Sequence, residues 1–315
     1  MNENYDELFH ASVKQEKPTS AQESTRLSPE EWAAKKKQNR EAAYALIDQG
    51  AEGIVMSPPK MEQYLAMQAR FPHYSVSNVL LLMAQCPNAT QIKDFNGWKA
   101  DGVFVKKGVT GLTILEPGKQ YTGADGRVRT SFDPKTVFDI SQVHAPKSHA
   151  APEAEDGALP TELEQKPVDR NLLLALIRQS PVEIEGVDTL DGGQQMGACY
   201  QHQIRRIQVK KSMPAEALFQ ALVCEIVHAE FGRDRESYSR AAYNYQARCA
   251  AYLICRHYQV DASCYNVRNA PATVSGLDAK QMRGQLASIR EAAGRVMNRV
   301  DKNLQYAEKQ AGKER

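Results

Sequence analysis

The sequence predicts an α+β protein: N-terminal helices packed on a small, mostly antiparallel sheet, and then a mainly helical domain with a short sheet. Apolar residues recur at helical spacing before residue 87 and again after residue 213. Between residues 90 and 143, short segments rich in β-branched and aromatic residues are separated by turns that contain glycine. Residues 146–168 hold four prolines and an excess of acidic residues without periodicity, which is typical of a linker.

These observations divide the chain into four segments. Residues 1–30 are polar and poor in branched apolar residues, so we expect them to be disordered. Residues 31–145 form the first domain, residues 146–168 the linker and residues 169–315 the second domain. Each domain is long enough to bury a core of its own.

Three helices are predicted at the start of the first domain. Residues 30–48 form the first helix, which we expect to end at Gly50, a common C-terminal signal. Residues 59–70 form the second, and the third begins in HYSVSNVLLLMAQ with Ser75 or Ser77 as its N-cap. The strands of the sheet are then predicted in TQIKDF, GVFVKK, GLTILEP, RVRTSF and KTVFDISQV.

The second domain begins with a helix in NLLLALIRQ and strands in VEIEGV and IRRIQVKK. Helices follow at about 213–231 and 237–258, and a last helix runs from Leu277 towards the C-terminus. Its apolar residues alternate steps of four and three, at Met282, Leu286, Ile289, Ala293, Val296 and Val300. We expect this apolar seam to pack the last helix on its own domain. The alternative is that the seam forms a dimer interface.

The composition excludes several classes of protein. The net charge is +2, from 40 basic and 38 acidic residues, so any nucleic-acid surface must be a local patch. No apolar run approaches the roughly 20 residues of a membrane span, and the polar N-terminus has no apolar core of a signal peptide. We therefore expect a cytoplasmic protein without a membrane partner, whose six cysteines are free thiols.

A group of aromatic and basic residues lies in the predicted sheet region. Trp98 and Lys99 are neighbours, and Phe104 precedes Lys106 and Lys107. Rings that stack on bases beside cations that bind phosphates are the combination that holds single-stranded nucleic acid. The alternative is that Trp98 and Phe104 fill the core and the lysines belong to a solvated hairpin.

The segment LVCEIVHAEFG, residues 222–232, resembles a zinc-binding helix that has lost a ligand. The usual motif H-E-x-x-H places two histidines on one face with a glutamate beside the metal. Here Cys224 and His228 take the two ligand positions and Glu225 that of the general base. A cysteine side chain is shorter than histidine, so a metal would lie out of reach unless the helix moved. His202 and His257 are additional candidate ligands.

Residues 71–117 resemble the N-terminal domain of ArdC-type antirestriction proteins, a module that binds single-stranded DNA in proteins of plasmids and conjugative elements. The matching positions are Tyr74-Ser75, Asn78, Leu80-Leu81, Phe95-x-x-Trp98, Val105-Lys106-Lys107-Gly108, Gly111 and Ile114-Leu115. The resemblance implies that the first domain binds single-stranded DNA. The candidate DNA-binding residues are Tyr74, Trp98, Lys99, Phe104, Lys106 and Lys107.

Residues 169–300 are similar to the metallopeptidase-like half of the same proteins, and more closely to that of LtrC-like proteins of conjugative elements. The resemblance is carried by IRRIQVKKSM, LFQALVCEIVHAEF and AAYLICRHYQVD, and it implies a zincin-like domain whose third ligand is a glutamate of the next helix. Arg248 occupies that position here, and an arginine cannot bind zinc. We expect Arg248 to bond Glu225 or Glu230 instead. The rival is a site formed by Cys224, His228 and Cys249.

Three functions remain open from the sequence. The first is a single-stranded-DNA-binding accessory protein of a mobile genetic element, with a degenerate peptidase-like domain, no catalytic residue and no cofactor. The second is a zinc metallopeptidase that uses Cys224, His228 and Cys249 as ligands. The third is a pure protein-interaction module. Single-stranded DNA is the expected partner, with element-encoded or host proteins as further candidates.

Overall fold

The computed structural model describes residues 28–144, 165–190, 197–234 and 236–311. The chain divides into two compact units, residues 1–38 and 39–315. In the first unit, Lys36 Nζ lies 5.3 Å from the centroid of the Trp32 ring. Most of the N-terminal segment that we expect to be disordered lies outside the described residues.

Three helices begin the described part of the chain: α1 (Pro29–Met56), α2 (Pro58–Arg70) and α3 (Val76–Gln85). The expectation that the first helix ends at Gly50 is wrong, because α1 continues for six more residues. A Cβ atom at Gly50 would lie 3.4 Å from Leu80 Cδ2. This glycine therefore allows close contact between α1 and α3 and does not cap a helix.

The N-cap of α3 is confirmed as Ser75. Its hydroxyl accepts a hydrogen bond from the backbone amide of Asn78 at 3.2 Å, which satisfies one of the free donors at the start of the helix.

A three-stranded antiparallel sheet follows, in the order β1 (Ile92–Lys93), β3 (Val128–Asp139), β2 (Leu112–Thr122). The two segments RVRTSF and KTVFDISQV form one strand, β3, and GVFVKK contributes only an isolated bridge between residues 105 and 143. Between β1 and β2 lies a short helix, α4 (Phe95–Ala100), which the sequence did not predict. The Asp94 carboxylate caps it by accepting from the Gly97 amide at 2.7 Å.

Helix α3 packs against the outer edge of β2 through two amide side chains. Asn78 donates to the Leu115 carbonyl at 2.9 Å and accepts from the Leu115 amide at 2.8 Å. Gln85 bonds the Thr113 carbonyl and amide in the same way, at 2.9 and 2.8 Å. The two side chains thus take the place of a neighbouring strand for alternate residues of β2.

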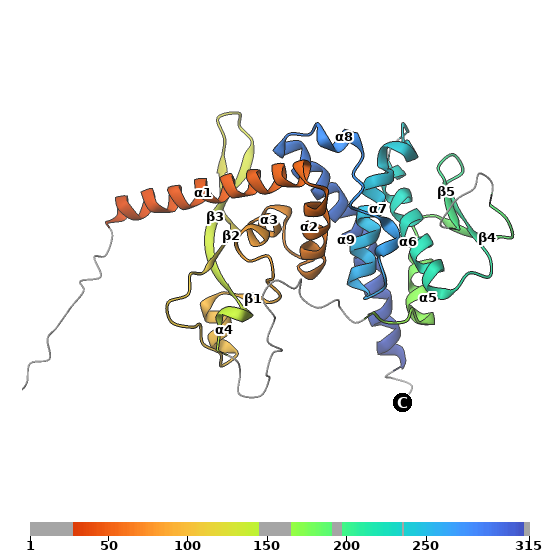
Figure 1. The fold of residues 1–315 in the computed structure, drawn as a ribbon, viewed down its shortest axis with the longest axis horizontal. Coiled ribbons are helices and arrows are strands. Elements are labelled where there is room, and N and C mark those ends of the chain that lie inside the picture. Colours follow the sequence, from red (N-terminus) through yellow and green to blue (C-terminus); the bar gives the residue numbers. More distant parts are fainter. Residues whose placement is uncertain (1–27, 145–164, 191–196, 235, 312–315) are drawn as a thin grey trace, which may run out of the picture. The chain divides into compact units, whose positions relative to one another are not determined.

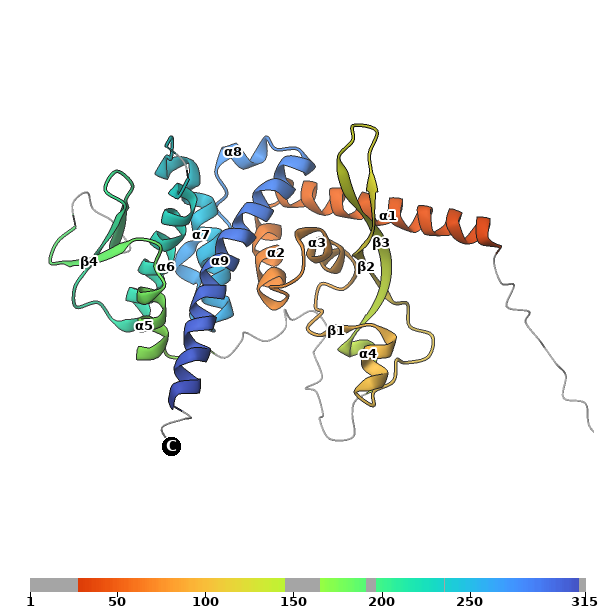
Figure 2. The ribbon, with the colours of Figure 1, turned by 180° about the vertical axis from the view of Figure 1, so that it is seen from behind.

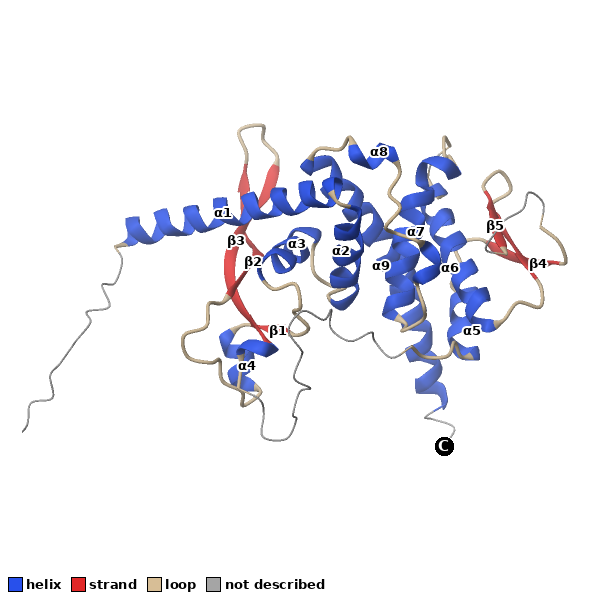
Figure 3. Ribbon diagram, viewed as in Figure 1, coloured by secondary structure: helices blue, strands red, loops and turns tan. Residues whose placement is uncertain are grey.

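The remaining elements form a helical assembly with a second small sheet (Figure 3). They are α5 (Arg170–Arg178), β4 (Glu183–Val187), β5 (Ala198–Gln201), β6 (Arg206–Lys210), α6 (Ala215–Gly232), α7 (Arg240–His257), α8 (Ala272–Ser275) and α9 (Ala279–Ala311). The sheet order is β4-β6-β5, with β4 parallel and β5 antiparallel to β6. Short 3₁₀ turns lie at Ile140–Gln142 and Ser263–Tyr265. These elements confirm the α+β fold class.

Helix α6 lies at the centre of this assembly, in contact with α5, α7, α9 and β5 (Figure 1). Every residue from Ala221 to Gly232 is buried. The seam of α9 is buried in the same chain, which confirms that it packs on its own domain.

One hydrophobic core continues from α1–α3 to α6, α7 and α9. Helix α2 packs against α7, and the two lie side by side in both views (Figures 1 and 2). Residues 145–164, most of the expected linker, lie outside the described part of the chain, so the domain boundaries stay a prediction. No helix among the described residues is long and apolar enough to cross a membrane.

Candidate functional site

The first candidate site is the surface formed by α4 and the segment that follows it. Phe95 and Phe104 are 52% and 58% exposed. The side chains of Lys99, Lys106 and Lys107 are also exposed. We call these five residues the α4 surface. Its rings and cations are exposed, and Lys106 Nζ also donates to the Ser141 carbonyl at 2.9 Å. Exposed rings and cations are what stacking on bases and contacting phosphates require.

Trp98 is buried, whereas stacking on bases requires an exposed ring. It is 3% exposed and packs with Val103 and Val143 in a small separate core. Its indole Nε1 donates to the Phe138 carbonyl at 2.8 Å. The tryptophan therefore anchors α4 to β3, and of the two alternatives for this residue the structure favours the core.

Tyr74 lies near the α4 surface but is half-buried. Its ring packs edge-on against Phe71 at 5.6 Å between centroids, and burial raises its pKa, opposed by the nearby charge of Lys135. Lys135 Nζ in turn lies 2.9 Å from an oxygen of Asp94, the N-cap of α4.

Sequence reasoning left Phe95 out of the candidate DNA-binding residues. The signal was present, because the Phe95-x-x-Trp98 pair is one of the positions that carry the resemblance to ArdC-type proteins. The capping role of Asp94 places Phe95 in the first turn, where its ring faces solvent.

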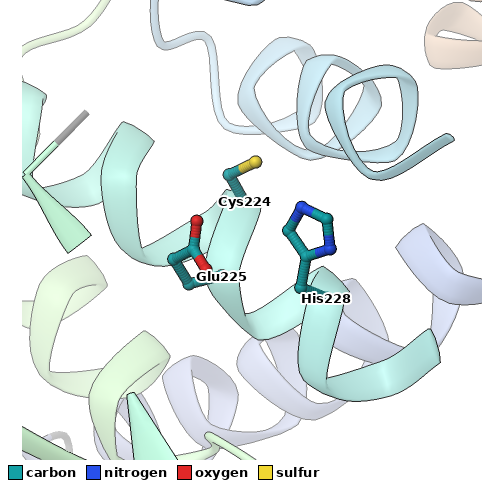
Figure 4. Close-up of side chains that lie close together, drawn as sticks. All are labelled: Cys224, Glu225 and His228. Atoms are coloured by element: carbon teal, nitrogen blue, oxygen red, sulfur yellow. The ribbon is translucent and has the colours of Figure 1, made fainter. Parts of the chain in front are cut away.

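The second candidate site lies on α6. Cys224, Glu225 and His228 are buried, and their ligand atoms all lie within 4.8 Å of one another. Figure 4 shows Cys224 and His228 projecting from the same side of the helix, as the spacing predicts. We call these three residues the α6 centre.

Glu225 is held by an arginine from the next helix. Arg240 donates to both carboxylate oxygens, at 2.6 and 2.7 Å, and the Tyr200 amide donates to Oε2 at 2.6 Å. Glu225 is 2% exposed. A carboxylate whose two oxygens both accept hydrogen bonds from a guanidinium is not available as a general base.

The expectation that Arg248 bonds Glu225 or Glu230 is wrong. Arg240 pairs with Glu225, while Arg295 and Arg299 pair with Glu230, each at 2.7 Å. Arg248 lies with its guanidinium carbon 5.7 Å from the centroid of the Tyr245 ring. The reason is geometric: Arg240 lies at the start of α7, and its side chain reaches Glu225, which also accepts the Tyr200 amide.

His228 is a neutral imidazole in this environment. Its Nδ1 lies 2.7 Å from the Tyr238 hydroxyl, and its buried Nε2 has no hydrogen-bond partner among the described residues. Burial, reinforced by the positive charge of Arg240 and opposed by Asn244, lowers the pKa of His228 to about 3. The neutral form is the one that binds metals.

The two cysteines proposed as ligands are buried thiols. Burial raises the pKa of Cys224 well above its usual range and that of Cys249 to about 12. Cys249 is fully buried and does not join the group of close donor atoms found among the described residues. Zinc binds the thiolate, so both side chains would have to lose a proton in an apolar site.

The α6 centre does not fit a zinc ion as it stands. Zinc would have to displace Arg240 from Glu225 and deprotonate Cys224, next to the guanidinium charges of Arg240 and Arg248. Only His228 offers a free donor atom. We therefore derive no chemical step through a metal, and the site with Cys249 as third ligand stays a prediction.

The two additional histidines lie apart from these three residues. His202 packs against the Tyr238 ring at 4.8 Å between centroids, and its Nδ1 lies 3.3 Å from the Tyr200 hydroxyl. His257 pairs with Asp301 at 3.2 Å. Neither belongs to a group of metal-ligating side chains in the part of the chain that the structure describes.

Comparison with known proteins agrees with the expected resemblance for the N-terminal half. Residues 36–155 match the family model of the N-terminal domain of anti-restriction factor ArdC. An uncharacterized protein of Bacillus anthracis is 22% identical over 330 residues, which cover 89% of this chain and 55% of that protein. The chain thus spans about half the length of this relative.

Two crystal structures of the antirestriction protein ArdC from plasmid R388 are also similar. The metal-free structure has a TM-score of 0.46 at 17% identity and covers 73% of this chain and 86% of that one. The Mn(II)-bound structure has a TM-score of 0.48 at 16% identity and covers 72% of this chain and 85% of that one.

Proposed function

We propose that this chain is an antirestriction-type protein of a mobile genetic element that binds single-stranded DNA, because residues 36–155 match the family model of the N-terminal domain of anti-restriction factor ArdC. Its α6 centre serves as a structural element without metal chemistry. Element-encoded or host proteins are its further partners, and antirestriction is the activity in which the DNA binding is used.

One observation supports DNA binding most directly: two exposed phenylalanines and three exposed lysines occur within residues 95–107. Free aromatic faces stack on bases of any sequence, and the lysines neutralise phosphates. The net charge of the whole chain is too small to drive this binding, so it depends on the local patch.

The test is a salt series of oligonucleotide binding by the full chain. Lys106→Ala with Lys107→Ala removes two phosphate contacts, so the slope of log affinity against log salt should flatten by about 1.4. The matched control is Lys210→Ala with Lys211→Ala, an adjacent pair of exposed lysines in the other half of the chain. An equal change in both double variants, or no binding by the wild type, contradicts the proposal. The second outcome favours a pure interaction module.

A zinc peptidase is the second candidate, because three potential ligand atoms lie within 4.8 Å of one another. The amount of zinc bound per chain after a chelator wash distinguishes a zinc peptidase from a DNA-binding protein without a metal. We expect none in the wild type, in Cys224→His or in Arg248→Glu, and we also expect none in their combination while Arg240 holds Glu225. Stoichiometric zinc in the wild type that is lost on Cys249→Ala favours the peptidase.

A further inference from the structure

A group of arginines lies where α2 meets α7. Arg70 ends α2, Arg256 lies in the last turn of α7, and Arg268 follows the 3₁₀ turn at 263–265. Burial raises the pKa of the Tyr252 phenol on α7, and the positive charges of all three arginines oppose that rise. The two helices lie side by side in both views (Figure 2).

The carboxylates near this group are already engaged. Glu62 of α2 pairs with Arg268. Asp139, which acts on Arg70 from the sheet, is buried and accepts hydrogen bonds from the Thr90 amide at 2.9 Å and the Ser141 hydroxyl at 2.7 Å. The three arginines are therefore accompanied by two carboxylates: Glu62, which is paired with Arg268, and Asp139, which is buried.

Arg70 is fixed in place without a counter-ion of its own. Its guanidinium donates to the carbonyls of Ala89 at 2.7 Å and Pro87 at 3.2 Å. Burial lowers its pKa, and the like charge of Arg256 lowers it further. The backbone carbonyls hold the side chain, while its positive charge stays largely uncompensated.

Arg256 has no ionic partner at all among the described residues. Its side chain makes no hydrogen bond or ion pair with them, and its Nε is buried without a hydrogen-bond partner. A half-buried cation beside a second cation is unfavourable unless an anion binds there. A guanidinium favours phosphate, which it can bind with two parallel hydrogen bonds.

We propose that Arg256 binds a phosphate of the single-stranded DNA, with Arg70 and Arg268 supplying the surrounding positive charge. This inference rests on the proposed function and extends it. The DNA-binding surface continues from the N-terminal domain along α2 onto α7, so the peptidase-like half takes part in holding the strand. A strand that reaches both regions is bound more tightly than one that reaches only the α4 surface.

The test compares Arg256→Gln with Arg178→Gln in the full chain. Arg178 is an exposed arginine on α5 whose side chain makes no hydrogen bond or ion pair with the described residues. It therefore controls for the loss of one positive charge. With an oligonucleotide of about 30 nucleotides, Arg256→Gln should flatten the salt slope by about 0.7 and weaken binding about fourfold at 0.15 M salt. With an oligonucleotide of about 8 nucleotides, which a single domain can hold, Arg256→Gln should leave both the affinity and the salt slope unchanged. Arg256→Lys, which keeps the charge, should keep the slope.

The outcomes separate this inference from the proposed function. If the wild type binds and the Lys106 and Lys107 double variant weakens binding, but Arg256→Gln behaves like Arg178→Gln, the α4 surface stands and the arginine site is overturned. If inorganic phosphate raises the melting temperature of the wild type and not of Arg256→Gln, while long oligonucleotides are bound equally, the site takes free phosphate and the inference is wrong. Absence of binding by the wild type contradicts both.

Discussion

The α4 surface and the α6 centre differ in burial and in how far their side chains are already paired within the chain. On the α4 surface, aromatic rings and lysines face solvent. In the α6 centre, the acid is paired with Arg240, the imidazole is neutral, and the thiol is protonated. Exposed charges are available to an outside partner, whereas charges paired inside the chain are already engaged, and removal of one partner destabilises the fold.

Of the two regions, only the α4 surface offers exposed side chains to another molecule. A metalloenzyme centre needs an open coordination position and an anion free to attract the metal. At the α6 centre the guanidinium of Arg240 supplies the positive charge beside Glu225, so the helix is held without an ion.

Trp98→Ala should destabilise the fold most, by about 3–5 kcal/mol, because it empties the small core under α4 and removes the bond to the Phe138 carbonyl. Chemical denaturation measures the loss. A variant of wild-type stability that binds DNA more weakly would instead make Trp98 a stacking residue, and the distinction between core and surface at α4 would fail.

Arg240→Met should cost about 3 kcal/mol, since it leaves Glu225 buried without its cation. This value is at the low end of the cost of breaking a buried ion pair, because the Arg240 side chain is 34% exposed and solvent screens its charge. Adding Glu225→Gln should recover most of the loss in a double-mutant cycle. Additive effects of the two changes would contradict a charge-paired centre.

Phe104→Ala should weaken binding to single-stranded DNA by about 1–3 kcal/mol with unchanged stability, because the exposed ring has few contacts in the fold to lose. Phe132→Ala, at another exposed phenylalanine of the sheet, is the matched control. If both variants bind like the wild type, the rings of the α4 surface are not the stacking platform.

His228 should make the folded protein sensitive to acid. Its pKa is about 3 in the folded state against an ordinary value of 6.5, so the unfolded chain binds the extra proton between these values. Stability attributable to His228 is therefore complete above pH 6.5 and falls by at most about 1.4 kcal/mol per pH unit below it. His228→Gln should show a shallower loss between pH 6.5 and 4 in urea unfolding. Parallel curves for the two proteins would show that the imidazole is not held neutral.

Much of the fold followed from periodicity and turn signals. The helices at residues 58–70 and 170–178, the cap at Ser75 and the burial of the seam in α9 were predicted from local sequence. Gly50 was mistaken for a helix end, because a stop signal and a glycine that allows close helix packing look alike in sequence. Helix α4 was missed because six residues are too few for a helical period to appear.

The candidate sites were predicted in part. Residues 224, 225 and 228 gather as their spacing on one helix requires, since that spacing is a local property. The partner of Glu225 could not be predicted, because it depends on how α7 crosses α6 and on which arginine reaches the carboxylate. Alignment to a motif put Arg248 there, eight residues beyond the true partner Arg240.

The hydrogen bonds of Asn78 and Gln85 of α3 with the edge of β2 have a consequence for self-association. Strand edges with free amides and carbonyls recruit other strands, which is a common origin of aggregation. Asn78 and Gln85 occupy those groups at Leu115 and Thr113, so a second copy or an extended peptide finds no open hydrogen-bonding edge there. The sheet of the N-terminal half is thereby closed to strand addition along this stretch, so a high local concentration of the chain does not join its sheets there.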